Sequence, residues 1–116
     1  MFYYVYILQS QKDESFYIGY TTDLIKRFKQ HNSGESQATK PFRPYKLIFY
    51  EAFLDRIDAK NREIYLKSGY GRKTINGLLK KYLAWFWQEA GLEPKIWNLA
   101  LSFLQTIQKQ TGTRFG

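Results

Sequence analysis

Alternating side chains near the start of the chain predict a β-hairpin. Both sets of alternate residues in the segment 3–8 are apolar or aromatic, so we expect a strand that is covered on both faces. After the polar stretch 10–15, the strand pattern resumes at 16–19, which predicts an antiparallel partner joined by a loop of about six residues. This pairing allows Tyr6 and Tyr17 to face the same side of the sheet.

A helix is predicted directly after the hairpin. The Thr-Thr-Asp sequence at 21–23 is typical of a helix N-terminus, because a hydroxyl at the cap accepts from free backbone amides and Asp23 complements the positive end of the dipole. Apolar residues continue at helical spacing to about residue 32, and Gly34 is a typical stop. Arg27 and His31 are four residues apart, on a face next to the apolar one.

A loop and a third strand come next. Residues 33–45 are polar and include two prolines and two basic residues, which predicts a loop of about a dozen residues, long enough to suggest a role in binding. The segment 46–53 is nearly all apolar. We therefore expect it to be the central strand of the sheet.

The second half of the chain is predicted to be helical. Asp55 or Asp58 begins a helix that runs to about Ser68, with Gly69 in the left-handed conformation after its end. Apolar residues keep helical spacing through 72–87 despite Gly77, which predicts one long amphipathic helix.

A last helix is predicted from Pro94 to about Lys109, followed by a frayed end at 111–116. The element order predicts an α+β fold, in which a three-stranded, mainly antiparallel sheet is flanked by helices and followed by extra C-terminal helices.

The length of 116 residues suits a single core. We expect residues 1–83 to form the sheet-containing domain and residues 84–116 to form a helical extension packed on it. Trp85, Trp87 and Trp97 make this extension either a cap on the core or a surface for a protein partner, and poor order is a third alternative. We favour the cap.

Composition excludes several classes of protein. No apolar run approaches the roughly 20 residues of a transmembrane helix, and no secretory signal is visible, so we expect a cytoplasmic protein without a membrane partner. The absence of cysteine excludes disulfides, thiolate zinc sites and cysteine nucleophiles, and a single histidine excludes a histidine-rich metal cluster.

Positive charge is concentrated in the middle of the chain. The net charge is +8, and residues 26–81 hold fourteen basic and five acidic residues. A basic surface concentrates polyanions, of which nucleic acid is the commonest, although a solubilising surface has the same composition.

Five polar side chains remain without an evident structural task once a core is assigned: Tyr6, Tyr17, Arg27, His31 and Glu63. Each has an ordinary alternative. Tyrosines are common in strands, an arginine is usually a solvated helix residue, and a histidine can end a helix. Glu63 can pair with basic residues of its own helix, namely Lys60, Arg62 and Lys67.

Together, these five residue types supply what a phosphodiester hydrolase needs. Arginine stabilises an anionic transition state with two parallel donors, and one carboxylate is enough to hold Mg²⁺ when water and substrate phosphate complete its shell. A tyrosine is a poor base at its ordinary pKa, so it needs a nearby cation, metal or histidine to lower that pKa. Arg27 and His31 are placed to do so.

Three blocks of the sequence resemble the GIY-YIG nuclease superfamily, and in particular its small stand-alone bacterial members. They are Tyr-Val-Tyr at 4–6, Tyr-Ile-Gly-Tyr-Thr-Thr-Asp-Leu at 17–24 with Arg27 and His31, and 59–63 with its terminal glutamate. The resemblance covers about residues 2–82 and extends to the amino-terminal domain of excinucleases, which implies a role in DNA repair. The second block is the specific one.

The resemblance implies metal-dependent cleavage of nucleic acid, with Mg²⁺ or Mn²⁺ as the single divalent ion. Tyr6 and Tyr17 match the two tyrosines that handle the attacking water, and Gly19 matches the glycine where a side chain would obstruct the site. Arg27 matches the arginine that stabilises the transition state, and His31 matches a position filled by His or Tyr. Glu63 matches the carboxylate that holds the metal.

The chain departs from the family pattern at two places. Tyr4 stands where the first motif usually has glycine, and many members carry a further polar residue after the glutamate, for which Asn76 is a candidate.

The sequence analysis therefore predicts an endonuclease of DNA or structured nucleic acid. The alternatives are a non-catalytic nucleic-acid-binding module on the same fold and an adaptor that binds proteins through its tryptophan-rich tail. The residues expected to contact the nucleic-acid backbone are Lys26, Lys29, Lys40, Arg43, Arg72 and Lys73.

Overall fold

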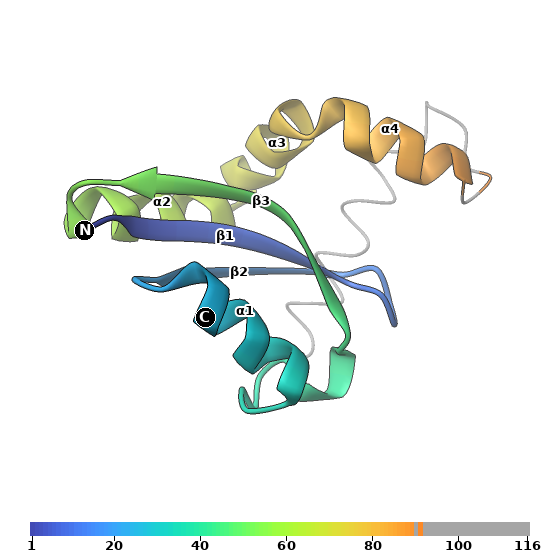
Figure 1. Cartoon of the computed structure of the whole chain (residues 1–116). Helices are drawn as coiled ribbons and strands as arrows, with labels where there is room; N and C mark the ends of the chain where they lie inside the picture. The colour runs from blue at the N-terminus through green and yellow to red at the C-terminus, as the bar shows by residue number, and fades with distance from the viewer. Residues whose placement is uncertain (90, 92–116) are drawn as a thin grey trace.

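The computed structural model describes residues 1–89 and 91 of the chain. The predicted helix at 94–109, Trp97 and the predicted frayed end lie outside the described residues. The strands are β1 (Tyr3–Ser10), β2 (Phe16–Thr21) and β3 (Tyr45–Phe53), and the helices are α1 (Leu24–Ser33), the short 3₁₀ helix η1 (Lys40–Phe42), α2 (Arg56–Lys67), α3 (Gly69–Leu78) and α4 (Lys80–Glu89). The α+β fold class is confirmed (Figure 1).

The three strands form one antiparallel sheet in the order β2-β1-β3. The central strand is therefore β1, and the prediction that 46–53 is central was wrong. Apart from Tyr45, the side chains of β3 are half-buried or exposed, so its apolar run does not mark a fully covered central strand. The β1–β3 register shifts between Ile7 and Leu8, which bends the sheet at its middle.

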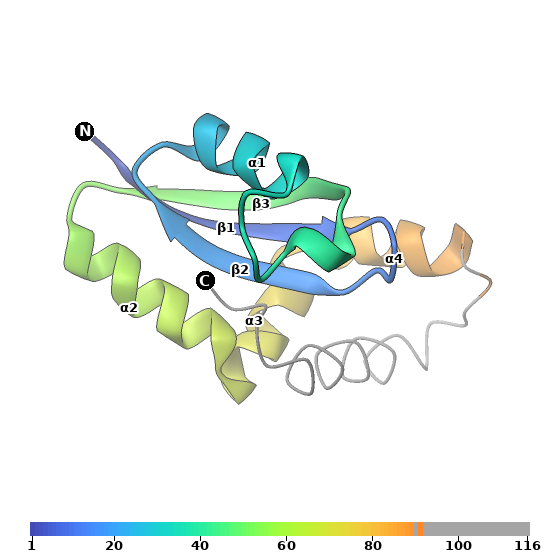
Figure 2. The same cartoon turned by 90° about the horizontal axis from the view of Figure 1, so that it is seen from below.

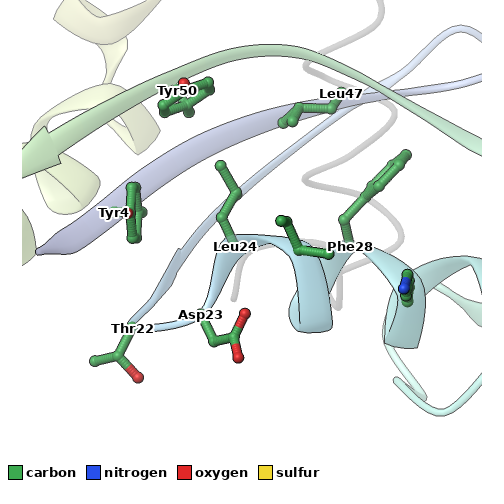
Figure 3. Close-up of a pocket in the computed structure, with 9 residues that line it drawn as sticks. Tyr4, Thr22, Asp23, Leu24, Phe28, Leu47 and Tyr50 are labelled. Carbon is green, nitrogen blue, oxygen red and sulfur yellow. The ribbon is translucent and has the colours of Figure 1, made fainter.

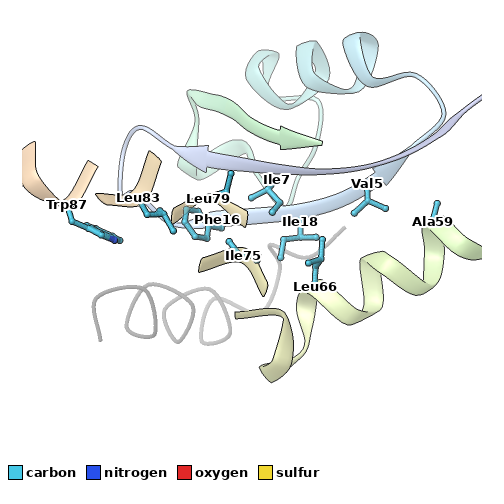
Figure 4. Packing of buried hydrophobic residues seen from close by; sticks show 10 residues of the cluster. All are labelled: Val5, Ile7, Phe16, Ile18, Ala59, Leu66, Ile75, Leu79, Leu83 and Trp87. Atoms are coloured by element: carbon cyan, nitrogen blue, oxygen red, sulfur yellow. The ribbon is translucent and has the colours of Figure 1, made fainter. Parts of the chain in front are cut away.

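One face of the sheet carries the main hydrophobic core. Alternate residues of β1 and β2 meet the inner faces of α2, α3 and α4 there, on the side away from α1 (Figures 2 and 4). The buried members are Val5, Ile7, Phe16, Ile18, Ala59, Leu66, Ile75, Leu79, Leu83 and Trp87. Burial of Leu83 and Trp87 attaches α4 to this core.

The opposite face of the sheet is covered by α1 and η1. Its buried aromatic and apolar residues are Tyr6, Leu8, Tyr17 and Tyr45, with Leu24 and Phe28 of α1 packed against them. The expected division of β1 into two faces is confirmed, because Val5 and Ile7 lie in the other cluster.

Local capping determines where α1 and α2 begin and end. Asp23 caps α1 by accepting from the backbone amide of Lys26, and Gly34 ends it in the left-handed conformation at φ 84°. Asp55, one of the two expected residues, caps α2 by accepting from the amides of Ile57 and Asp58. The stop at Gly34 and the start at Asp55 were predicted from the sequence, whereas the cap of α1 is the Asp23 carboxylate rather than the expected hydroxyl.

The long helix predicted at 72–87 is wrong in two respects. Helix α3 begins at Gly69, so this residue is helical rather than left-handed, and the helix is interrupted at Leu79. The amide of Leu79 still bonds to the Ile75 carbonyl at 2.9 Å, and the amide of Leu83 to the Leu79 carbonyl at 2.8 Å. Because these bonds continue through the interruption, the apolar spacing stays in phase and does not reveal it.

No helix among residues 1–89 is long and apolar enough to span a bilayer.

Candidate active site

The two predicted site tyrosines come from neighbouring strands. Tyr6 of β1 lies opposite Gly19 of β2, and Tyr17 is two residues from Gly19, so all three are on the face covered by α1. The two rings are 6.2 Å apart between centroids, and both side chains are buried. A Cβ at Gly19 would collide with the Tyr6 hydroxyl and lie 2.9 Å from Cε1 of Tyr17. Glycine is therefore required where the phenol of Tyr6 crosses β2.

His31 joins the tyrosines from the last turn of α1. Its Nε2 lies 2.8 Å from the Tyr6 hydroxyl, and its ring meets that of Tyr17 edge to face at 4.7 Å between centroids. The side chain is fully buried. Burial first, and the charge of Arg27 second, lower the pKa of His31 to about 4. His31 is therefore neutral at neutral pH.

Thr39 completes this network, although the sequence analysis did not single it out. It lies fully buried at the start of η1, with Oγ1 2.8 Å from Nδ1 of His31, and it donates to the carbonyl of Ser36 at 3.4 Å. Because the Thr39 hydroxyl has a single proton, which it donates to the carbonyl of Ser36, its oxygen accepts a hydrogen bond from the His31 imidazole. The network therefore assigns the His31 proton to Nδ1 and makes Nε2 the acceptor of the Tyr6 hydroxyl.

Asn32 holds the end of α1 against the sheet. Its side chain bonds to both backbone groups of Tyr45, accepting from the amide at 2.6 Å and donating to the carbonyl at 3.1 Å. Because Asn32 follows His31 directly, this pair of bonds positions the imidazole over β1.

Arg27 lies one turn before His31 and brings a positive charge to both phenols. Its guanidinium donates to Oε1 of Gln30 at 3.2 Å. Burial works against the charge, but the neighbouring Tyr6 and Tyr17 raise the pKa of Arg27 above its ordinary value, so the guanidinium stays charged.

The expectation that Arg27 and His31 lower the tyrosine pKa values was wrong in its net direction. Burial raises the pKa of both Tyr6 and Tyr17, and the opposing effect of Arg27 is smaller. Desolvation of a phenolate wins because the rings are covered by α1, and His31 is a hydrogen-bond acceptor rather than a cation. Both tyrosines are neutral phenols in the free protein.

Glu63 is a buried carboxylate on α2, in the layer opposite to α1. Its Oε2 lies 3.1 Å from Nζ of Lys67, and its Oε1 lies 3.8 Å from Nζ of Lys60. The ordinary alternative, in which Glu63 pairs with basic residues of its own helix, is therefore found for Lys60 and Lys67. Arg62 instead pairs with Glu51 at 2.7 Å. The charge of Glu63 nevertheless raises the pKa of Tyr17, the same phenol on which Arg27 acts. The charges of Arg27 and Glu63 therefore act on the pKa of Tyr17 in opposite directions.

Glu63 is the residue that fits a divalent ion at this site. Hard cations such as Mg²⁺ prefer carboxylate oxygens, and one or two carboxylates suffice when water and phosphate supply the other ligands. The described residues contain no group of three or more His, Cys, Asp or Glu side chains arranged for a metal. The site therefore fits a divalent ion that is held by the Glu63 carboxylate alone. Such an ion would compete with Lys67 for that carboxylate.

The predicted backbone-contacting residues are divided between the two helical layers. Lys26 and Lys29 lie exposed on α1, and Lys40 and Arg43 lie exposed at η1, so these four share the face that carries the tyrosines. The others belong to α3, in the opposite layer, as does the candidate polar residue after the glutamate: Arg72, Lys73 and Asn76. The structure thus brings together four of the six basic residues.

Comparison with known proteins shows which family the chain resembles. Residues 2–76 match the GIY-YIG catalytic domain. A UPF0213 protein of Clostridium perfringens is 46% identical over 65 residues, which cover 55% of this chain and 69% of the relative. A UPF0213 protein of Haloquadratum walsbyi is 43% identical over 68 residues, which cover 58% and 75%.

A solved structure is also similar to this chain. The solution NMR structure of a UPF0213 protein from Bacillus halodurans is 36% identical, with a TM-score of 0.44, and the match covers 67% of this chain and 85% of that one. The match over residues 2–76 spans more than half of the chain, and it contains every residue of the tyrosine, arginine, histidine and glutamate set. The chain belongs to the GIY-YIG catalytic domain family.

Proposed function

We propose that this chain is a metal-dependent endonuclease that hydrolyses phosphodiester bonds in DNA or structured nucleic acid. The observation that carries the proposal is the environment of Tyr17, whose phenol lies in the field of both the Arg27 guanidinium and the Glu63 carboxylate. Beside it, Tyr6 is bonded to a neutral imidazole at 2.8 Å. The proposal is supported by a cation for the phosphate, by a carboxylate whose charge acts on Tyr17, and by a proton acceptor bonded to Tyr6.

Arg27 is the group that binds and stabilises the phosphate. A guanidinium donates two parallel hydrogen bonds to phosphate oxygens, and its charge does not depend on pH in the working range. Because Arg27 lies beside both phenols, a phosphate bound to its guanidinium would lie next to their hydroxyls.

Tyr6 and His31 form the path for the proton. The Tyr6 oxygen takes a proton from the attacking water while its own proton passes to Nε2 of His31, with Thr39 holding Nδ1. A bound phosphate offsets the charge of Arg27, which is one of the two causes that keep the pKa of His31 low. Substrate binding therefore raises the basicity of His31 when a base is needed.

Glu63 is the residue that would hold Mg²⁺ or Mn²⁺, and the bound ion would supply positive charge at the scissile phosphate. Lys67, whose Nζ lies 3.1 Å from Oε2 of Glu63, has to release that oxygen for the purpose.

A cleavage assay on three substrates tests the proposal. Supercoiled plasmid, branched DNA and RNA are each incubated with Mg²⁺, Mn²⁺ or a chelator, and strand scission is followed on gels. We expect scission only with a divalent ion, and Arg27→Ala should lower its rate by roughly a hundred- to a thousandfold. Arg56→Ala is the matched control, because Arg56 is an exposed arginine at the start of α2.

A non-catalytic nucleic-acid-binding module is the second candidate function. It is favoured by the pairing of both Glu63 oxygens with lysines and by the neutral state of both tyrosines. Binding of all three substrates without scission under every metal would establish the module and refute the nuclease.

A further inference from the structure

An open aromatic groove lies beside the tyrosine site, between α1 and the strands β1 and β3. It has a volume of about 560 Å³. Leu24, Phe28 and Leu47 line it, and the same residues pack against the cluster that contains Tyr6 and Tyr17 (Figure 3). The groove and the candidate active site therefore share a wall.

Two tyrosines provide the flat surfaces of this groove. Tyr4 and Tyr50 face each other edge to face, with ring centroids 6.1 Å apart and an interplanar angle of 62°. Tyr50 is 53% exposed and forms none of the core contacts of β3. An exposed ring beside an apolar floor is the arrangement on which nucleobases stack, because every base has a flat π face.

The charges around the groove suit a strand of nucleic acid. Lys29 lines the groove, and Lys26 lies beside it in the adjoining depression that shares Asp23, Ile25 and Lys29. Neither lysine forms an ion pair within residues 1–89. Two carboxylates also border this region: Asp23, which accepts from the backbone amide of Lys26 at 3.1 Å as the cap of α1, and Glu35, which accepts from the Ser33 hydroxyl at 2.9 Å. Since neither carboxylate forms an ion pair with Lys26 or Lys29, the two ammonium groups can bind a phosphate.

The spacing along β1 relates the groove to the tyrosine site. Tyr4 is two residues from Tyr6 on the same face, a separation of about 7 Å along the strand. This is close to the length of one nucleotide in an extended strand. A base in the groove would therefore belong to a nucleotide next to the phosphate at Arg27.

We propose that this groove binds an unpaired nucleobase of the nucleic-acid strand, stacked against Tyr50 and Tyr4, with its phosphate on Lys29 and Lys26. The inference deepens the proposed function, because it names unpaired nucleotides as part of the substrate. The base comes from a single strand or from an unpaired position of a branched or bulged duplex. A fully paired duplex has no base to place there.

Binding measured with a chelator present tests the groove separately from cleavage. The probes are a fluorescent oligothymidylate, the same strand made of abasic nucleotides, a hairpin with one unpaired thymidine, and a full duplex. Tyr50→Ala should weaken binding of the oligothymidylate about tenfold, because one stacked base contributes that order of affinity. It should leave the affinity for the abasic strand and the duplex unchanged.

Two further variants make the assay specific. Tyr50→Trp should restore or increase affinity for the oligothymidylate, since the stacking surface is kept. Tyr70→Ala is the matched control, because Tyr70 is a 76% exposed tyrosine on α3, in the opposite layer. The Tyr70→Ala variant should bind the oligothymidylate with the same affinity as the parent protein.

The outcomes separate this inference from the nuclease. Loss of base-dependent binding in Tyr50→Ala supports the groove even where no scission occurs, and the hairpin shows whether a single unpaired base in a duplex suffices. Equal affinity of the parent protein for thymidylate and abasic strands, or an unchanged affinity in Tyr50→Ala, would overturn the groove while leaving the cleavage assay valid.

Discussion

The two faces of the same sheet differ in how they are filled. Val5 and Ile7 point into a cluster made of apolar side chains from α2, α3 and α4. Tyr6, which lies between them in sequence, points the other way into a buried network with His31 and Thr39. Alternation along one strand thus separates side chains of the apolar core from the side chains that we propose to take part in catalysis.

The difference shows why the polar face needs more exact local structure. Apolar contacts are tolerant of small shifts, whereas buried polar groups need each partner within hydrogen-bond distance. That requirement explains the bidentate bonds of Asn32 to β3, the absence of a side chain at Gly19 and the buried hydroxyl of Thr39. On the apolar face, the irregular step at Leu79 is accommodated without loss of burial.

The largest expected effect comes from removing one hydroxyl on the polar face. Tyr6→Phe should lower the rate of phosphodiester cleavage by about 10²- to 10⁴-fold, because the proton path to His31 is lost. The free energy of unfolding should fall by only about 1 to 3 kcal/mol, since one buried hydrogen bond is removed. Cleavage assays and urea denaturation on the same preparation measure both. A fall in rate no larger than the fall in folded fraction would contradict the assignment.

The opposite result is expected on the apolar face. Ile18→Ala should lower the free energy of unfolding by about 2 to 5 kcal/mol, because Ile18 is 1% exposed and leaves a cavity. The cleavage rate per folded molecule should not change. Ile18→Val, which removes a single methylene, should cost only about 1 kcal/mol and serves as the graded control.

The pH dependence of the free energy of unfolding is a third test of the difference between the two faces of the sheet. The pKa of His31 is about 4 in the folded state and near its ordinary 6.5 when unfolded, so the unfolded chain binds the extra proton first. Stability should therefore fall as pH decreases from about 6.5 to about 4. Each pKa unit corresponds to about 1.4 kcal/mol, which gives a loss on the order of 3 kcal/mol.

His31→Gln is the control for this dependence. Burial raises the pKa of Glu14, which changes stability in the opposite direction over acidic pH, so the informative quantity is the difference between parent and variant. Identical pH profiles of the two proteins in urea denaturation would contradict the assignment of a buried neutral histidine.

The smallest expected effect tests Thr39 as the positioning residue for His31. Thr39→Val keeps the shape but removes the partner of Nδ1, and we expect cleavage to slow about tenfold, as for one lost hydrogen bond. Thr39→Ser should restore the rate. Because His31 is the sole histidine of the chain, its ¹⁵N NMR shifts report the tautomer directly. We expect a proton on Nδ1 in the parent and in Thr39→Ser, and a mixture of tautomers in Thr39→Val.

Much of this architecture was predictable from local signals. The pairing of β1 with β2, the start of a helix after residues 21–23 and the stop at Gly34 follow from spacing and capping chemistry. The hairpin also predicted that Tyr6 and Tyr17 face the same side of the sheet, which is confirmed. These features depend on residues close in sequence, which is why the pattern contains them.

The remainder depends on contacts between distant segments. The order of the strands, the edge position of β3 and the role of Thr39 arise when residues 33–45 fold back over α1. The raised pKa values of the tyrosines likewise come from coverage by α1, which no spacing along β1 or β2 reveals. The domain division at residue 83 stays a prediction.

The attachment of α1 through Asn32 has a consequence for sequence change. Its two bonds reach only main-chain atoms of Tyr45, so they are indifferent to the identity of the side chain there. The constraint on position 45 therefore comes from the packing of its side chain against His31 and the tyrosine cluster, whereas replacement of Asn32 would release the helix that bears both Arg27 and His31.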